Sequence, residues 1–196
     1  LARTTRPDVG LRLQYAATLL KTQQDVELAG ILRQLQNVPM SAKEQRSYND
    51  LRMAYIVRQA EALRESGNLV AAYDVLAPVL AERPGDPAAT GALARMYAAN
   101  NDYAQALALY NQLLEKEPNN VPILLSAATM ATGAKEYGYA ASALQIALLR
   151  APQDPEVLTA AGRLARAQGQ STQAGQYFAA AIAAEERQRA IQLSAS

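Results

Sequence analysis

The sequence predicts an all-α protein, a right-handed solenoid of about ten antiparallel helices stacked as helix–turn–helix units. Three prolines, Pro84, Pro118 and Pro152, follow one another at intervals of 34 residues. A fixed period of this length is typical of arrays whose units bury their apolar faces only against their neighbours. The composition agrees, because 50% of the residues are hydrophobic and only 10 Gly and 9 Pro interrupt the 196-residue chain.

A column of small residues in the second helix of each unit follows the same period. Four positions after each small residue stands a large apolar or aromatic one. A methyl-sized side chain lets two helices approach while the large one fills the groove beside it, so we expect the small residues to be buried. The column consists of Ala72, Ala106, Ala140 and Ala174, followed by Leu76, Tyr110, Leu144 and Phe178.

These periodicities divide the chain into five segments. We expect residues 87–120 and 121–154 to be complete units, and 155–196 to be a unit with a terminal helix extension. Residues 1–40 form a degenerate unit, with Ala29 in the alanine column, and a joint. Residues 41–86 form a unit with an extended first helix, because Ser41 and Glu44 make a capping box that opens a helix early.

Caps and turns place the individual helices. Asp86-Pro87 and Asp154-Pro155 each put an N-cap acceptor before a proline in the first turn. The long helix is expected from Ala42 to about Glu65. The first helix is expected to contain Leu13, Ala16, Ala17 and Leu20. The others are expected near 26–35, 69–82, 87–100, 103–116, 121–134, 137–150, 155–168 and 171–190. A hinge is expected where the spacing breaks, at Gln36, Asn37, Val38, Pro39 and Met40.

The composition also excludes several functions. The net charge is +1, without a concentrated basic segment, so we expect no nucleic-acid partner. The chain has neither His nor Cys, which removes acyl-transfer triads, thiol chemistry and His-based metal sites. We therefore predict a segment that is not an enzyme, needs no cofactor or metal and does not insert into a membrane. The paired acids, Glu61 with Glu65 and Glu185 with Glu186, are interpreted as solvated helix faces.

The period, the alanine column and the prolines resemble those of the tetratricopeptide repeat. Residues 58–80, with Pro78 inside a second helix, and residues 160–169 resemble the carboxy-terminal repeats of the bacterial cellulose synthase operon protein C family. In that family a periplasmic array of repeats precedes an outer-membrane pore through which the glucan leaves the cell. The resemblance implies a periplasmic fragment of a larger outer-membrane-associated protein.

The candidate binding residues line the inner wall that first helices form in such repeats. The five candidates are Arg64, Arg95, Thr129, Arg163 and Arg166. The arginines either contact a partner or lay their stems along apolar surface. Val57 and Gly91 stand where co-chaperone members of the repeat family hold a terminal carboxylate with basic residues, so that clamp is not expected. Tyr48 and Tyr139 lie outside the core columns and either pack or face a ligand.

The resemblance implies a non-enzymatic scaffold of a cellulose export system, which aligns the inner-membrane synthase with the outer-membrane pore through contacts with other proteins of the complex. Contact with glucan or peptidoglycan is expected to be weak, because Trp is absent and most aromatic residues fall in packing columns. The alternative is a peptide-binding adaptor of an unrelated complex.

Overall fold

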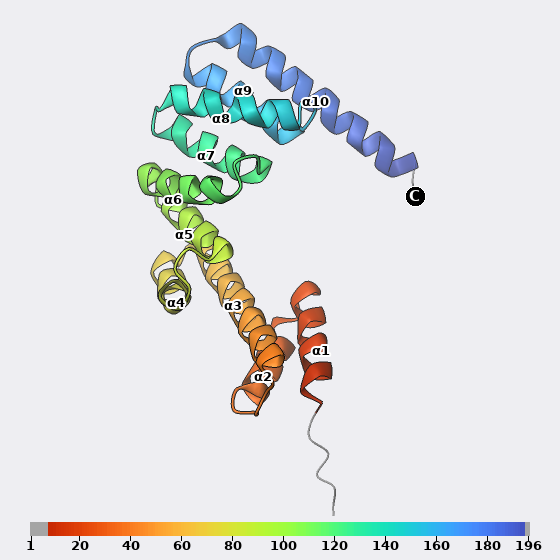
Figure 1. Cartoon of the computed structure of the whole chain (residues 1–196). Coiled ribbons are helices and arrows are strands. Elements are labelled where there is room, and N and C mark those ends of the chain that lie inside the picture. The colour runs from red at the N-terminus through yellow and green to blue at the C-terminus, as the bar shows by residue number, and fades with distance from the viewer. Residues whose placement is uncertain (1–7, 195–196) are drawn as a thin grey trace, which may run out of the picture. The chain divides into compact units, whose positions relative to one another are not determined.

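The structure, a computed structural model, describes residues 8–194, and all regular elements of this range are α-helices (Figure 1). Consecutive helices pair as antiparallel hairpins. The helices are α1 (Val9–Lys21), α2 (Asp25–Leu35), α3 (Ala42–Glu65), α4 (Leu69–Glu82), α5 (Pro87–Ala99), α6 (Tyr103–Lys116), α7 (Val121–Gly133), α8 (Tyr137–Arg150), α9 (Pro155–Ala167) and α10 (Ser171–Ser194). The chain divides into two compact units, residues 1–84 and 85–196.

The long helix α3 organises the first unit. It begins at the predicted capping box: the Ser41 hydroxyl accepts from the Glu44 amide at 3.3 Å, and the Ser41 amide donates to the Glu44 carboxylate at 2.8 Å. Further along, the Arg58 guanidinium donates to the Leu20 carbonyl at 2.6 Å and lies 3.1 Å from Asp25. One helix of 24 residues therefore joins the α1/α2 hairpin to α4.

The first hairpin buries its apolar residues against the start of α3. Leu28 is fully buried there and Ala29 is only half-buried, so the alanine column does not extend into this hairpin as expected. The buried position of this hairpin therefore holds a leucine in place of a methyl-sized residue. Tyr48 is buried in the same cluster, and its hydroxyl donates to the Leu32 carbonyl at 3.2 Å. Tyr48 is thus a packing residue.

The predicted joint at residues 36–40 lies between α2 and α3. The Val38 amide donates to the Leu35 carbonyl at 3.2 Å, and Val38 and Met40 contact the buried cluster of the first unit. The mobility expected of this segment stays a prediction.

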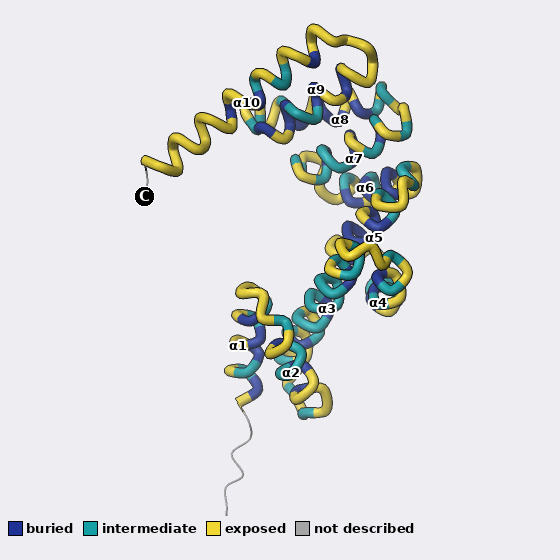
Figure 2. Tube along the Cα trace, turned by 180° about the vertical axis from the view of Figure 1, so that it is seen from behind, coloured by how far each residue is buried: buried dark blue, intermediate teal, exposed yellow. Residues whose placement is uncertain are grey.

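In the second unit α5 to α9 pack around one apolar cluster, and α10 packs against α9 through a smaller one. Figure 2 shows these buried positions along α5 to α9 and the exposed far end of α10. Ala106 and Ala140 are fully buried and Ala174 is 4% exposed; in the first unit the corresponding Ala72 is also fully buried. A Cβ on Gly162 would lie only 2.7 Å from the Phe178 ring, which shows how tightly α9 and α10 meet.

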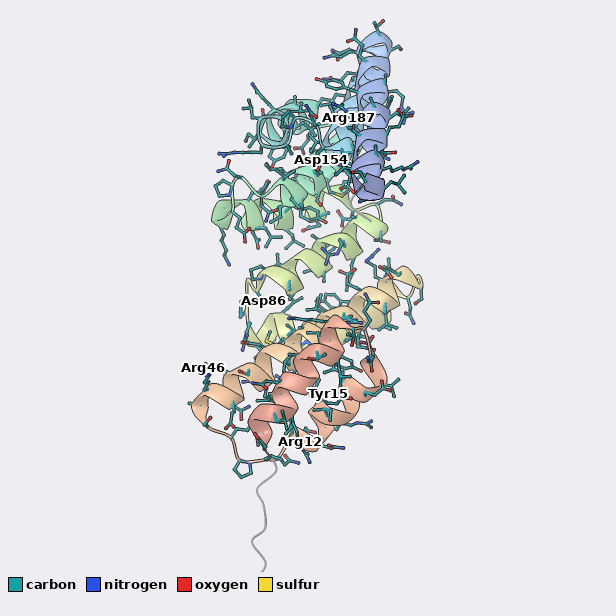
Figure 3. The ribbon with its side chains drawn as sticks, turned by 90° about the vertical axis from the view of Figure 1, so that its right-hand side faces the viewer. Arg12, Tyr15, Arg46, Asp86, Asp154 and Arg187 are labelled. Atoms are coloured by element: carbon teal, nitrogen blue, oxygen red, sulfur yellow. The ribbon has the colours of Figure 1, made fainter. Side chains whose placement is uncertain are left out.

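Each of α5, α7 and α9 begins with a side-chain cap. Asp86 accepts from the Ala89 amide at 2.9 Å, and Asn120 accepts from the Ile123 amide at 3.2 Å. Asp154 accepts from two amides of α9, and the adjacent Gln153 accepts from Arg187 of α10 at 3.2 Å (Figure 3). The caps therefore repeat with the 34-residue period and fix where each first helix starts.

Candidate binding surface

The five predicted inner-wall residues are distributed over α3, α5, α7 and α9. Arg64 lies between two carboxylates of its own helix, 2.7 Å from Glu61 and 3.3 Å from Glu65. The Arg166 guanidinium lies 5.8 Å from the centre of the Phe178 ring, a cation–π distance. Both cations are thus engaged within their own repeat.

The other three candidates lie in the second unit. Arg163 and Thr129 are exposed, and the Thr129 hydroxyl donates to the Leu125 carbonyl one turn back at 2.8 Å. The Arg95 guanidinium lies against the backbone of Gly91, with a nitrogen 3.3 Å from the place where a Cβ would stand.

Arg95 also lines a groove between α5, α6 and α7, with a volume of about 190 Å³. Tyr110 and Lys116 of α6 face the same groove, and the Lys116 ammonium donates to the Gly85 carbonyl at 2.9 Å. Arg95 is one of the expected wall residues, whereas Lys116 is not, because it belongs to a second helix and the expected wall consists of first helices.

A larger pocket, of about 430 Å³, lies between α8, α9 and α10. Buried apolar residues, among them Leu144 and Leu164, form its floor. Among the described residues that line it, none is charged. Its polar residues are Gln145, Gln168, Gln170, Gln173 and Tyr177.

None of the pocket's lining residues was among the expected binding residues, although a comparison of successive repeats at the 34-residue spacing indicates the pocket. Tyr139 and Asn111 are the counterparts, one repeat earlier, of Gln173 and Gln145. In that earlier repeat the Tyr139 hydroxyl of α8 donates to the Asn111 amide oxygen of α6. Burial, and secondarily the Glu136 carboxylate, raise the pKa of the Tyr139 phenol, so the phenol stays protonated. Tyr139 therefore packs.

The comparisons with known proteins agree with this architecture. Residues 63–131 match the tetratricopeptide repeat family. Residues 41 to the end of MamA from Desulfovibrio magneticus RS-1 superpose with a TM-score of 0.68 at 17% identity, over 94% of this chain and 99% of that one. A tetratricopeptide repeat protein from Parabacteroides merdae ATCC 43184 gives a TM-score of 0.67 at 16% identity, over 91% of this chain and 67% of that one. Residues 63–131 thus match the tetratricopeptide repeat family, and the chain shares its all-α repeat fold with these two solved structures.

Among curated proteins, the chain is similar to cellulose synthase operon protein C. It is 41% identical over 184 residues to that protein of Pseudomonas fluorescens (strain SBW25), covering 94% of this chain and 14% of the relative. It is 53% identical over 107 residues to that of Xanthomonas axonopodis pv. citri (strain 306), covering 55% of this chain and 7% of the relative. The chain thus spans about a seventh or less of the length of these relatives.

Proposed function

We propose that this chain is a non-enzymatic scaffold segment of a cellulose export system. The observation that carries the proposal is the 41% identity to cellulose synthase operon protein C over 94% of the chain. In the proposal the repeats lie in the periplasm. Through protein–protein contacts they align the inner-membrane synthase with the outer-membrane pore.

The packing of the repeats supports a structural role. Stacked units of this kind add length in fixed steps and offer extended surfaces to partner proteins. The interfaces are closed by fully buried alanines such as Ala106 and Ala140, while two of the inner-wall cations, Arg64 and Arg166, have partners within their own repeats. No helix within residues 8–194 is long and apolar enough to cross a membrane.

Two changes in the complete parent protein test the proposal. Deleting residues 121–154 removes one 34-residue unit and should shorten the scaffold, and we expect secreted cellulose to fall strongly. Replacing Arg95, Arg163 and Arg166 together by alanine keeps the length and should lower secretion less. Immunoblots must show equal protein levels. Normal secretion with the deletion, or a larger loss with the triple substitution, would contradict the spacer role.

The groove beside Arg95 favours a second candidate, a peptide-binding adaptor. Arg95 and Lys116 place two cations near Tyr110, a combination suited to an acidic side chain or a terminal carboxylate. Glu117 lines the same groove, and its carboxylate would repel a negatively charged ligand. Binding of acidic peptides that Arg95→Ala abolishes, with normal secretion in the triple variant, would favour the adaptor.

A further inference from the structure

We propose that the pocket between α8, α9 and α10 binds one ring of a neutral, hydroxylated sugar chain, as in a β-glucan. The inference rests on the proposed function and names a ligand site within it. It starts from a difference between two successive repeats.

The earlier repeat provides a template for what the pocket accepts. There, a six-membered ring bearing a hydroxyl, the side chain of Tyr139, extends from α8 and donates to the amide oxygen of Asn111 on α6. One repeat later, Gln173 on α10 stands in place of that tyrosine and Gln145 on α8 in place of the asparagine. The hydroxylated ring is thus absent from this position, while an amide that can bond to a hydroxyl is kept.

One neighbouring substitution adds space and two remove charge, while Tyr177 stands in place of Ala143 and adds a ring to the lining. Leu107 is replaced one repeat later by Ala141, which lines the pocket. Glu136 is replaced by Gln170 and Glu115 by Leu149, and both replacements also line it. A neutral ligand loses less hydration free energy than an ion on entering such a site, so the lining favours an uncharged ligand.

The lining also matches the two kinds of surface on a pyranose ring. Each glutamine amide offers donors and an acceptor, as sugar hydroxyls require. Within the described part of the chain, the side chains of Gln145, Gln168, Gln170, Gln173 and Tyr177 have no hydrogen-bond partner. The floor and the Tyr177 ring are apolar surfaces that can cover the C–H face of the sugar.

The site is suited to weak, reversible contact. Its rim glutamines are exposed, so a bound ring stays partly hydrated. An extended glucan could therefore pass while touching the pocket with one ring at a time. The expectation of weak sugar binding is kept, but the contact lies in this pocket and not at the arginines of the inner wall.

The test is a titration of the 196-residue chain with cellohexaose, followed by amide and side-chain NH₂ shifts in NMR spectra. We expect saturable shifts that centre on the five polar residues of the pocket. Tyr177→Ala should weaken binding about tenfold. The double change Gln145→Asn with Gln173→Tyr reproduces the tyrosine–asparagine pair of the earlier repeat and should abolish binding. Gln176→Ala, an exposed change on α10 outside the pocket, is the matched control.

The double variant must retain the helical content and melting temperature of the unmodified chain, because only then does a loss of binding show that the new tyrosine fills the pocket. If the double variant is less helical or melts earlier, Tyr177→Ala provides the independent test. No shifts with cellohexaose, shifts centred on Arg95 or Arg163, or binding of a capped neutral hexapeptide in its place would overturn the proposal. The unit deletion removes the α8 side of the pocket together with the length, so the titration, and not secretion, separates the two proposals. A chain that gives no shifts would refute the pocket and leave the scaffold role standing.

Discussion

Ala106 is fully buried in the apolar cluster of the second unit, where it contributes a methyl group to a close helix approach. Its column was read correctly from the sequence because close packing restricts residue size at a regular spacing. Tyr48 and Tyr139 could not be assigned in the same way. The Tyr48 hydroxyl donates to the Leu32 carbonyl and the Tyr139 hydroxyl to the Asn111 amide oxygen. These partners lie far away in the sequence, so the residue type at one repeat position does not predict them.

Replacing Ala106 by glutamate should reduce the free energy of unfolding by about 3 kcal/mol or more, because the carboxylate would be buried without a partner. The matched control is Ala104→Glu, an exposed change on the same helix, which should have an effect within about 0.5 kcal/mol. Urea denaturation of both variants measures the difference. Equal stability of the two variants would show that the helix register is wrong.

Tyr139 should make stability fall in alkaline solution. Because burial and Glu136 raise the pKa of its phenol, the folded chain retains a proton that the unfolded chain releases. This contribution is complete below the unfolded pKa of about 10 and is lost as the pH rises through the folded pKa. The stability of the unmodified chain should therefore fall relative to that of Tyr139→Phe as the pH rises above about 10, and denaturant unfolding of both proteins measures the difference. A difference that stays constant as the pH rises would contradict the assignment.

The turn inside each repeat is the element whose backbone recurs most regularly. Gly67, Asn101, Lys135 and Gly169 follow at the 34-residue spacing, and all have positive φ, between 61° and 82°. Each ends a first helix, and the amide of the next residue bonds back to that helix, as Asp102 does to the Tyr97 carbonyl at 2.9 Å. Glycine and asparagine are residue types that favour such turns, so Gly67, Asn101 and Gly169 mark them in the sequence and Lys135 does not.

Lysine at this position adopts a left-handed conformation that glycine takes without steric cost. Lys135→Gly should therefore stabilise the chain by up to about 1 kcal/mol and raise the melting temperature by roughly 2–4 °C. Lys135→Ala is the control, since it removes the charge and keeps the Cβ. A melting temperature that rises equally in both variants would assign the effect to the charge instead of the backbone.

Over the whole molecule, the period and the caps predicted the ten helices of the described residues, and the capping box of Ser41 and Glu44 predicted the early start of α3. Helix α10 extends to Ser194, four residues beyond the expected end. The pocket between α8, α9 and α10 was not predicted, because it arises from what is missing relative to the earlier repeat. Comparing one position at a time between repeats shows which residue each repeat has there. A pocket depends on two or more positions on different helices, such as Gln145 and Gln173. The hinge at residues 36–40 stays a prediction.

The claim that the units are interchangeable is tested most directly by circular dichroism of a chain that lacks residues 121–154. The deletion joins Asn120, which caps α7, to Pro155, which begins α9 after the equivalent cap Asp154. We predict unchanged helical ellipticity per residue and a cooperative thermal transition, since each unit contacts only its neighbours. Loss of helical signal, or melting without a transition, would contradict an array of equivalent stacked repeats.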